Sequence, residues 1–389
     1  MKISVVSAHA SPLPVLDDAE EGGQDVHVAE LAAALVAAGH DVVVHTRRDS
    51  PRSPEVVRTR DGYDVVHVPA GPPSPVHPDE MLPHLDELTR SLRAQWRGDR
   101  PDVVHAHYWT SGVASVLAVN GLDVPVVQTF HSLGAEAQLE GDETVPEVRV
   151  STERLIGREA CRVIASCTDE KSQLVRSGVP RAKIAVVPPG VDVRRYKPDG
   201  PRLNRTLPHR IVSPAAGAED AIMALRSVWD TELVVVGGRP EDVRRLREKS
   251  HAAGVGDRVR LVGRVPQVAL PALLRSADVV VCAATDPTVT PLEAMACGVP
   301  VIAATVGGAP DTVVDGVTGL LVPPSDHRAL TRALRPLLTD DARRDAYGIA
   351  GADRVQARYS TDRIAAETAR VYREATGRPE AIEASVQDA

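Results

Sequence analysis

Residues 286–324, DPTVTPLEAMACGVPVIAATVGGAPDTVVDGVTGLLVPP, carry the clearest secondary-structure signals in the chain. A helix is predicted to start after Thr290, because threonine is a good N-cap and Pro291 suits the first helical position. Glu293 lies three residues after Thr290, where its carboxylate can complete a capping box. Gly298 and Pro300 limit this helix to a short one.

The second half of the same stretch alternates between apolar runs and glycines. A buried strand is predicted over residues 299–305, and Gly307-Gly308 follows it. A second helix is expected to end at Gly316, and residues 319–322 predict another strand. Strands, glycine turns and helices in close succession are typical of α/β proteins that direct helix N-termini at phosphate groups.

Strand and helix patterns alternate along the rest of the chain as well. Strands are expected at residues 2–7, 41–45, 63–69, 102–106, 125–130, 162–166 and 184–187, and again at 232–238, 259–263 and 277–284. Helices are expected at residues 24–38, 79–97, 147–160, 327–339, 340–357 and 362–376. This alternation predicts an α/β protein with doubly wound, mostly parallel sheets.

The composition narrows the classes of function. A chain of 389 residues has room for two α/β domains, and 43% hydrophobic with 25% charged residues is typical of a globular protein. The formal net charge of −8 argues against a nucleic-acid partner. No apolar run approaches the ~20 residues of a membrane span. The four cysteines form no CxxC pair, so we expect reduced thiols in a cytoplasmic protein.

The segments PLEAMACGVPVIA and GGAPDTVVDGVTGLLVPP together resemble the donor-nucleotide segment of the retaining glycosyltransferases of family 4. The glycine loop and first helix, EEGGQDVHVAELAAALVAAGHDVVVHTRR, are similar to that family too, nearest to its actinobacterial mycothiol-pathway branch. The resemblance implies the GT-B fold, in which two Rossmann-like domains face each other across a cleft. It also implies a nucleotide-diphosphate sugar as co-substrate, a small polar acceptor, no cofactor and a possible homodimer.

The resemblance also implies a domain organisation. An acceptor-side domain is expected over residues 1–192, ending in PPGVD, which matches the family's inter-domain hinge. A polar, proline-containing linker would follow at residues 193–208, and a nucleotide-sugar-binding domain at 209–359. The last helix, within residues 360–376, would pack back on the first domain.

Gly22 and Gly23 stand just before a predicted helix. Glycine lets the backbone approach a ligand, and a helix N-terminus favours phosphate, although a bare glycine pair is more often an ordinary tight turn. The family match favours the first interpretation, in which this loop contacts the donor's β-phosphate and the acceptor.

His105 and His107 form an HxH pair at a strand end, where strand alternation places both on one face. No further ligands suggest themselves, so zinc is not favoured and we predict no metal site. The resemblance instead implies acceptor contacts from Gln24, His107, Tyr108 and Ser132. It places His131 beside the transferred sugar, although a lone histidine at a strand end is often structural.

Glu293 has two interpretations that do not exclude each other. As a capping-box residue it stabilises its helix by about 1 kcal/mol. In the family, the corresponding glutamate binds the hydroxyls of the nucleotide ribose, and Thr290, Pro291 and Leu292 belong to the same nucleotide-binding segment.

The sequence departs from the family pattern where the diphosphate should bind. The first carboxylate of the family's pair has only Asp286 as a counterpart, in a shortened loop without glycine that leads to Glu293. Ala216 stands where the family carries a lysine, and the neighbouring arginine is missing as well. Arg264 is our candidate replacement, whereas Arg239 is interpreted as a surface residue.

Two functions are therefore open. The first is a retaining, metal-independent transfer of a sugar from a nucleotide donor, in which the leaving phosphate helps to deprotonate the acceptor. His131 and Asp286 would then be the residues beside the reacting sugar. The second is a GT-B protein that has lost turnover and serves as a binding or partner subunit. A nucleotide-sugar epimerase of the same fold is a more distant third.

Overall fold

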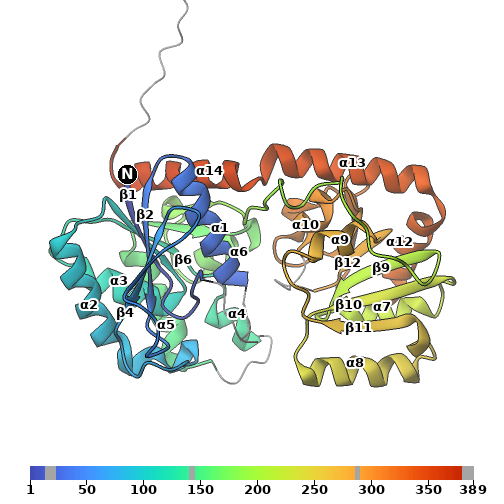
Figure 1. The fold of residues 1–389 in the computed structure, drawn as a ribbon, viewed down its shortest axis with the longest axis horizontal. Helices are drawn as coiled ribbons and strands as arrows, with labels where there is room; N and C mark the ends of the chain where they lie inside the picture. Colours follow the sequence, from blue (N-terminus) through green and yellow to red (C-terminus); the bar gives the residue numbers. More distant parts are fainter. Residues whose placement is uncertain (14–22, 140–144, 285–289, 379–389) are drawn as a thin grey trace, which may run out of the picture. The chain divides into compact units, whose positions relative to one another are not determined.

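The computed structural model of the chain describes residues 1–13, 23–139, 145–284 and 290–378, and these residues form two compact units (Figure 1). Unit 1 combines the described residues of 1–188 with those that follow residue 361, and unit 2 covers Pro189–Thr361. Both units are α/β structures, which confirms the predicted fold class.

Unit 1 is built on a sheet with the strand order β3-β4-β2-β1-β5-β6-β7-β8. Its strands are β1 (Lys2–Val6), β2 (Asp41–Arg47), β3 (Val56–Arg58), β4 (Asp64–Val68), β5 (Val103–His107), β6 (Val126–Thr129), β7 (Arg162–Ala165) and β8 (Ile184–Val186). All neighbours are parallel except β3, which pairs antiparallel with β4. The sequence pattern does not predict β3, because this short edge strand buries none of its three residues fully.

Helices cover both faces of this sheet (Figure 1). They are α1 (Gly23–Ala37), α2 (Leu85–Gly98), α3 (Trp109–Ala118), α4 (Gly134–Leu139), α5 (Glu147–Glu159), α6 (Thr168–Arg176) and α14 (Thr361–Ala375), with 3-10 turns η1 (Pro78–His84) and η2 (Arg181–Lys183). α1 and α14 share one core with β1 and β2, in which Leu35, Tyr372 and Val44 are fully buried. α2 and α3 pack on the other face, through Leu88 and Trp96 of α2 and Ala114 of α3.

The helix expected at residues 79–97 is divided in two. Residues Pro78–His84 form a 3-10 turn, and the α-helix begins only at Leu85. Pro83 lies inside the turn. Because proline lacks an N–H and restricts the residue before it, an α-helical ladder cannot run through this position without a break.

Unit 2 contains a parallel sheet with the order β11-β10-β9-β12-β13-β14. Its strands are β9 (His209–Pro214), β10 (Thr231–Val236), β11 (Val259–Gly263), β12 (Val279–Cys282), β13 (Val301–Ala304) and β14 (Gly319–Val322). Its helices are α7 (Ala218–Leu225), α8 (Pro240–Ala252), α9 (Leu270–Arg275), α10 (Pro291–Ala296), α11 (Ala309–Thr312), α12 (His327–Thr339) and α13 (Asp341–Arg358), with the 3-10 turn η3 (Gly256–Arg258). Two buried clusters, one containing α9 and α10 and the other α7 and α12, form its core.

The second helix of the opening stretch is shorter than predicted. α11 ends at Thr312 instead of reaching Gly316. The residues after it form a tight turn, in which the N–H of Gly316 donates to the carbonyl of Gly319 over 2.9 Å. The Thr318 hydroxyl accepts a hydrogen bond from the N–H of Val314, so side-chain and turn contacts replace the helical ladder.

Residues 193–208, expected to be a linker, lie within unit 2. Tyr196 is 1% exposed and belongs to the unit 2 core. Arg275 donates hydrogen bonds to the carbonyl oxygens of Lys197 (3.1 Å) and Pro201 (3.0 Å). At these positions the backbone of the segment is held by a side chain rather than by a strand ladder.

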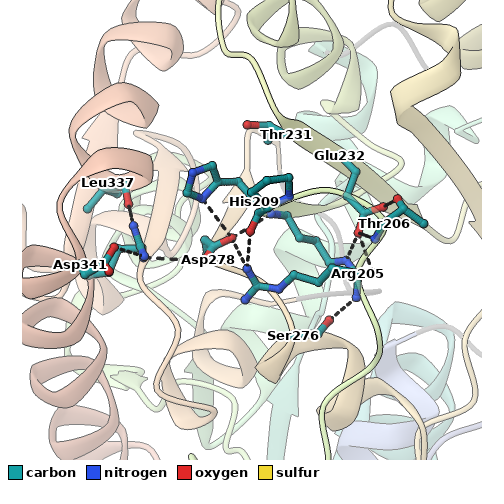
Figure 2. Close-up of polar contacts among 12 residues, drawn as sticks. Arg205, Thr206, His209, Thr231, Glu232, Ser276, Asp278, Leu337 and Asp341 are labelled. Carbon is teal, nitrogen blue, oxygen red and sulfur yellow. Dashed lines mark hydrogen bonds and ion pairs between the residues drawn. The ribbon is translucent and has the colours of Figure 1, made fainter.

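A buried charge network completes this attachment at the start of β9, β10 and β12 (Figure 2). Arg210 and Glu232 are each 1% exposed, and the Arg210 Nε donates to Glu232 over 2.7 Å. Arg205 pairs with Asp278 over 2.7 Å, and Thr206 also binds Glu232. Burial opposes ionisation of Glu232, but hydrogen bonds from Thr206 and Arg210 outweigh it, so the pKa of Glu232 lies below its ordinary value.

Candidate active site

Two strained residues mark the carboxyl end of the unit 1 sheet. Tyr108 follows β5 with φ 74°, and His131 follows the neighbouring strand β6 with φ 65°. Side chains other than glycine rarely adopt such backbone angles, and they cost about 1–3 kcal/mol each. Strain of this kind at the ends of adjacent strands is typical of functional sites in parallel sheets.

His105 and His107 share one face of β5, as strand alternation predicts. Their ring centroids are 4.1 Å apart. His105 is bonded at both nitrogens, to the Tyr372 hydroxyl (2.7 Å) and the Thr129 hydroxyl (2.9 Å). Nδ1 of His107 lies 2.8 Å from Nε2 of His131.

His107 does not fit the role expected of it as an acceptor contact. Its exposed fraction is 0%, whereas His131 is exposed. A side chain without exposed surface has no face on which an acceptor could bind, and the polar contact of His107 is its hydrogen bond to His131. Within the described residues, no group of three or more His, Cys, Asp or Glu side chains is arranged to hold a metal ion.

His27 of α1 joins this cluster, although the sequence pattern does not single it out. Its ring lies 5.7 Å from that of His107 and 5.4 Å from that of His131. Burial lowers the pKa of His27 to about 4. Burial, with repulsion from His27, lowers the pKa of His105 to about 3. The cluster is therefore neutral at pH 7. The local signal that could have found His27 is its place one turn after Gly23.

Tyr108 and Ser132, two predicted acceptor contacts, are brought together by Arg149, which was not among the predicted site residues. The Arg149 guanidinium lies 4.8 Å from the centre of the Tyr108 ring and donates to the Ser132 hydroxyl over 2.8 Å. Glu153 accepts from Arg149 over 2.8 Å and from the backbone N–H of Gly134. Arg149 and Glu153 are both nearly fully buried.

The predicted residues at the glycine loop are described only in part. Gly22 lies outside the described residues, and Gly23 is the first residue of α1. Gln24 follows it, and its side-chain amide donates to the Ser7 hydroxyl over 3.1 Å. Gln24 is thus tied to the end of β1, in the same unit as His131 and Tyr108.

The helix start predicted in unit 2 is confirmed at α10. The Thr290 N–H donates to the Glu293 carboxylate over 2.8 Å, and the Glu293 N–H donates to the Thr290 hydroxyl over 3.3 Å. Pro291 occupies the first turn, and Leu292 is buried at 3% exposure. Burial raises the pKa of Glu293, although hydrogen bonds from Thr290 and Tyr196 oppose that shift.

The turn before α7 is where the sequence predicts that diphosphate contacts of unit 2 would lie. Gly217 has φ 76°, and a Cβ there would lie 2.9 Å from backbone atoms of Ala283 and Ala284. This close approach places the Ala216-Gly217 turn next to the residues that precede segment 285–289. Asp286, expected beside the transferred sugar, is in that segment and outside the described residues.

The basic residues near this turn are engaged elsewhere. Glu219 in the first turn of α7 pairs with Arg245 and Lys249 of α8. Arg239 caps α8 and pairs with Glu241 and Asp242 over 3.2 Å, with its side chain 64% exposed. That placement agrees with its interpretation as a surface residue. Arg264 follows β11 and is exposed.

No helix within the described ranges is long and apolar enough to cross a membrane.

Two family models match the chain. Residues 22–190 match the glycosyl transferase 4-like domain, and residues 210–354 match glycosyl transferases group 1.

Similar proteins cover nearly the whole chain. The D-inositol 3-phosphate glycosyltransferase of Xylanimonas cellulosilytica is 36% identical over 97% of each chain. That of Streptomyces bingchenggensis is 34% identical over 96% of this chain and 89% of its own. The structure of sucrose-phosphate synthase from Thermosynechococcus elongatus has a TM-score of 0.86 at 29% identity, covering 96% of this chain and 98% of the other.

A solved structure of Anabaena HepE in complex with UDP and glucose shares the fold, with a TM-score of 0.72 at 18% identity over 96% of this chain and 100% of the other. These matches extend through both units. The chain belongs to the family 4 glycosyltransferases of the GT-B fold.

Proposed function

We propose that this protein transfers a sugar from a nucleotide-diphosphate donor to a small polar acceptor, with retention of the anomeric configuration and without a metal ion. The observation that carries the proposal is the strained pair Tyr108 and His131, which present polar side chains at adjacent strand ends. Strain is maintained where the surrounding structure over-determines it, and ligand sites are a common reason for it.

The acceptor is assigned to unit 1, where Tyr108, Ser132 and Gln24 lie in the same unit as His131. Relatives are named for D-inositol 3-phosphate and for sucrose phosphate, so we propose an acceptor of polyol or sugar character, with or without a phosphate. Arg149 supports this choice indirectly, because its buried guanidinium bonds the Ser132 hydroxyl and lies over the Tyr108 ring, and so fixes two side chains proposed to contact the acceptor. Glu153 already neutralises part of its charge.

The donor is assigned to unit 2. Glu293 would bind the ribose hydroxyls through its carboxylate, which accepts hydrogen bonds from a diol. Thr290 and the backbone of Pro291 and Leu292 would line the same nucleotide segment. Arg264 is the exposed cation that we propose near the diphosphate, in place of the lysine that the family carries at Ala216.

In the proposed reaction, the acceptor hydroxyl forms the new glycosidic bond as the bond to the nucleotide diphosphate breaks. The proton of that hydroxyl passes to an oxygen of the leaving phosphate on the same face of the sugar. No side-chain nucleophile is needed. A missing cation would mainly weaken the stabilisation of the leaving diphosphate. The loss of one contact to developing charge raises the activation free energy by about 2.7–4 kcal/mol.

The pairing of Arg245 and Lys249 with Glu219 favours a second candidate, a binding or partner subunit without turnover. Calorimetric titration with UDP, GDP and ADP tests both candidates. We expect micromolar binding of one nucleotide, followed by nucleotide release from its sugar donor when an acceptor is added. Binding without release would favour the non-catalytic candidate, and no binding at millimolar nucleotide would contradict the transferase proposal.

The finer features have their own measurements. The anomeric configuration of the product, read by NMR, tests retention. Turnover that persists in excess EDTA tests independence from metal. Loss of turnover on chelation, restored by Mg²⁺, would overturn that part of the proposal.

A further inference from the structure

The surroundings of His107 constrain the direction of its hydrogen bond to His131. Nδ1 of His107 and Nε2 of His131 are 2.8 Å apart, so one nitrogen carries the hydrogen and the other accepts it. His107 has no exposed surface. Its second nitrogen, Nε2, is also buried and has no hydrogen-bond partner within the described part of the chain.

Two neutral arrangements of the protons are consistent with this geometry. In the first, His107 donates from Nδ1 and its buried Nε2 keeps a lone pair. In the second, His131 donates from Nε2, and the hydrogen of His107 sits on the buried, unpartnered Nε2. An orphaned N–H is rare in protein interiors and costs about 1–3 kcal/mol, so the first arrangement is favoured.

Burial and the neighbouring histidines disfavour a doubly protonated His107 at neutral pH. Burial lowers the pKa of His107 well below its ordinary value, and repulsion from His105, His131 and His27 lowers it further. His107 therefore has one hydrogen to place, and its surroundings favour Nδ1.

We propose that His107 is a positioning residue that holds His131 in the tautomer with its hydrogen on Nδ1. His131 then accepts from His107 through Nε2 and offers a substrate an N–H donor instead of a lone pair. In this state neutral His131 has no free basic nitrogen. It would orient and stabilise a substrate oxygen without removing a proton, which is compatible with proton transfer to the leaving phosphate.

His105 keeps His107 in the required orientation. Its ring lies 4.1 Å from that of His107, and its own nitrogens are fixed by Tyr372 and Thr129. The second nitrogen of His131, Nδ1, has no hydrogen-bond partner in the ranges that the structure describes, and the residue is exposed. The Nδ1–H of His131 is thus the one hydrogen-bond donor that the pair offers to a substrate, and the buried His107 holds it in place.

The tautomer can be measured in the free protein by long-range ¹H–¹⁵N correlation NMR on a sample labelled at histidine. The signals of His131 and His107 are assigned from their absence in His131→Asn and His107→Asn samples. We expect Nδ1 to be the protonated, pyrrole-type nitrogen and Nε2 the pyridine-type nitrogen in both residues. A protonated Nε2 in His131 would overturn the proposal.

Substitution of His107 tests whether the tautomer of His131 matters for turnover. This experiment rests on the proposed function. His107→Asn retains an amide near the position of Nδ1, His107→Gln places it near Nε2, and His107→Leu has no polar group. We expect His107→Leu and His107→Gln to lower kcat by about 10- to 100-fold, the scale of other supporting hydrogen bonds, with little change in donor KM. His107→Asn should recover most of that loss.

The two proposals fail in distinguishable ways. Absence of transfer by the unmodified protein contradicts the proposed function, whereas the NMR measurement still decides the tautomer. Equal kcat losses in His107→Asn and His107→Leu, with unchanged thermal stability, would contradict the positioning role. Urea unfolding of each variant separates a loss of kcat from a loss of folded protein.

Discussion

Tyr108 and His131 hold backbone angles that the remainder of unit 1 must enforce. Gln128 of β6 contributes, because its side-chain amide donates to the carbonyl oxygens of Tyr108 (3.1 Å) and Thr129 (2.8 Å). Gln128 is 0% exposed. This buried amide ties the end of β5 to the end of β6 and holds the backbone of Tyr108 directly.

At Glu293, one side chain combines a structural contact with a proposed ligand contact. Glu293→Gln should keep the cap, because glutamine also serves in a capping box, and should change the free energy of unfolding by less than about 1 kcal/mol. If the carboxylate binds ribose hydroxyls, nucleotide affinity should fall by about 10-fold or more, since hydrogen bonds to charged groups contribute roughly 1.5–3 kcal/mol. Urea unfolding and calorimetric nucleotide titration measure the two effects.

Asp326 provides the matched control for that experiment. Its side chain caps α12 by accepting from the N–H groups of Arg328 and Ala329. Asp326→Ala should lower stability through loss of the cap and leave nucleotide affinity unchanged. Unchanged nucleotide affinity in Glu293→Gln would contradict the ribose contact and leave Glu293 with a structural role as a helix cap only.

Single residues could be predicted from the sequence where their contacts are local. The Thr290–Glu293 cap spans three residues, and the shared face of His105 and His107 follows from strand alternation, so both could be predicted. Arg149 meets Tyr108 from a separate helix, and His27 meets His131 from a helix much earlier in the chain. Such contacts depend on the packing of whole elements, which periodicity does not encode.

At the scale of elements, the turn before α7 is fitted closely against the end of β12. Gly217→Ala should destabilise the protein for two reasons, the φ of 76° and a new Cβ 2.9 Å from the backbone of Ala283. Gly254→Ala isolates the first reason, because Gly254 has φ 70° and open space where a Cβ would be added. We expect about 1 kcal/mol for Gly254→Ala and at least about 1 kcal/mol more for Gly217→Ala in urea unfolding. Equal costs would mean that the turn adjusts freely.

The buried pair Arg210–Glu232 holds residues 203–206 against the start of β9 and β10 (Figure 2). Glu232→Gln should destabilise unit 2 by about 3–5 kcal/mol, because it leaves the Arg210 charge buried without its partner. The exposed pair Arg239–Glu241 is the control, with side chains 64% and 53% exposed. Glu241→Gln should cost less than about 1 kcal/mol. A cost for Glu232→Gln as small as that of the control would show that water reaches Arg210.

Element boundaries were predicted well where one signal dominates. Strong apolar runs located β1, β12 and β13 in the right places, and the capping signals located α10. The exceptions were decided by competing local chemistry: Pro83 divided one predicted helix, and the turn at Gly316 shortened another. Composition alone predicted a linker at residues 193–208. It does not reveal that Arg205, Arg210 and Arg275 attach this segment to unit 2 by meeting distant partners.

At the scale of the whole molecule, the two units should differ in their response to acid. The buried histidines with strongly lowered pKa values lie in unit 1, including His45 and His27 at about 4 and His105 at about 3. A histidine whose pKa is lower in the folded than in the unfolded state stabilises the fold fully above its unfolded pKa of about 6.5. That contribution is lost as the pH falls from about 6.5 toward the folded value, because the unfolded chain then binds more protons.

We therefore expect unit 1 to lose stability steeply between about pH 6.5 and pH 4, by about 1.4 kcal/mol per pH unit for each such histidine. Tryptophan fluorescence can follow unit 1, since Trp96 and Trp109 are buried in it, whereas Trp229 of unit 2 is 76% exposed. His105→Gln should be less stable at pH 7, because it loses contacts to Tyr372 and Thr129. Between pH 6.5 and pH 4, however, unfolding of this variant should take up about one proton fewer than unfolding of the unmodified protein. A pH dependence equal to that of the unmodified protein would mean that His105 is not held neutral by burial, and the case for a neutral histidine cluster around His131 would weaken with it.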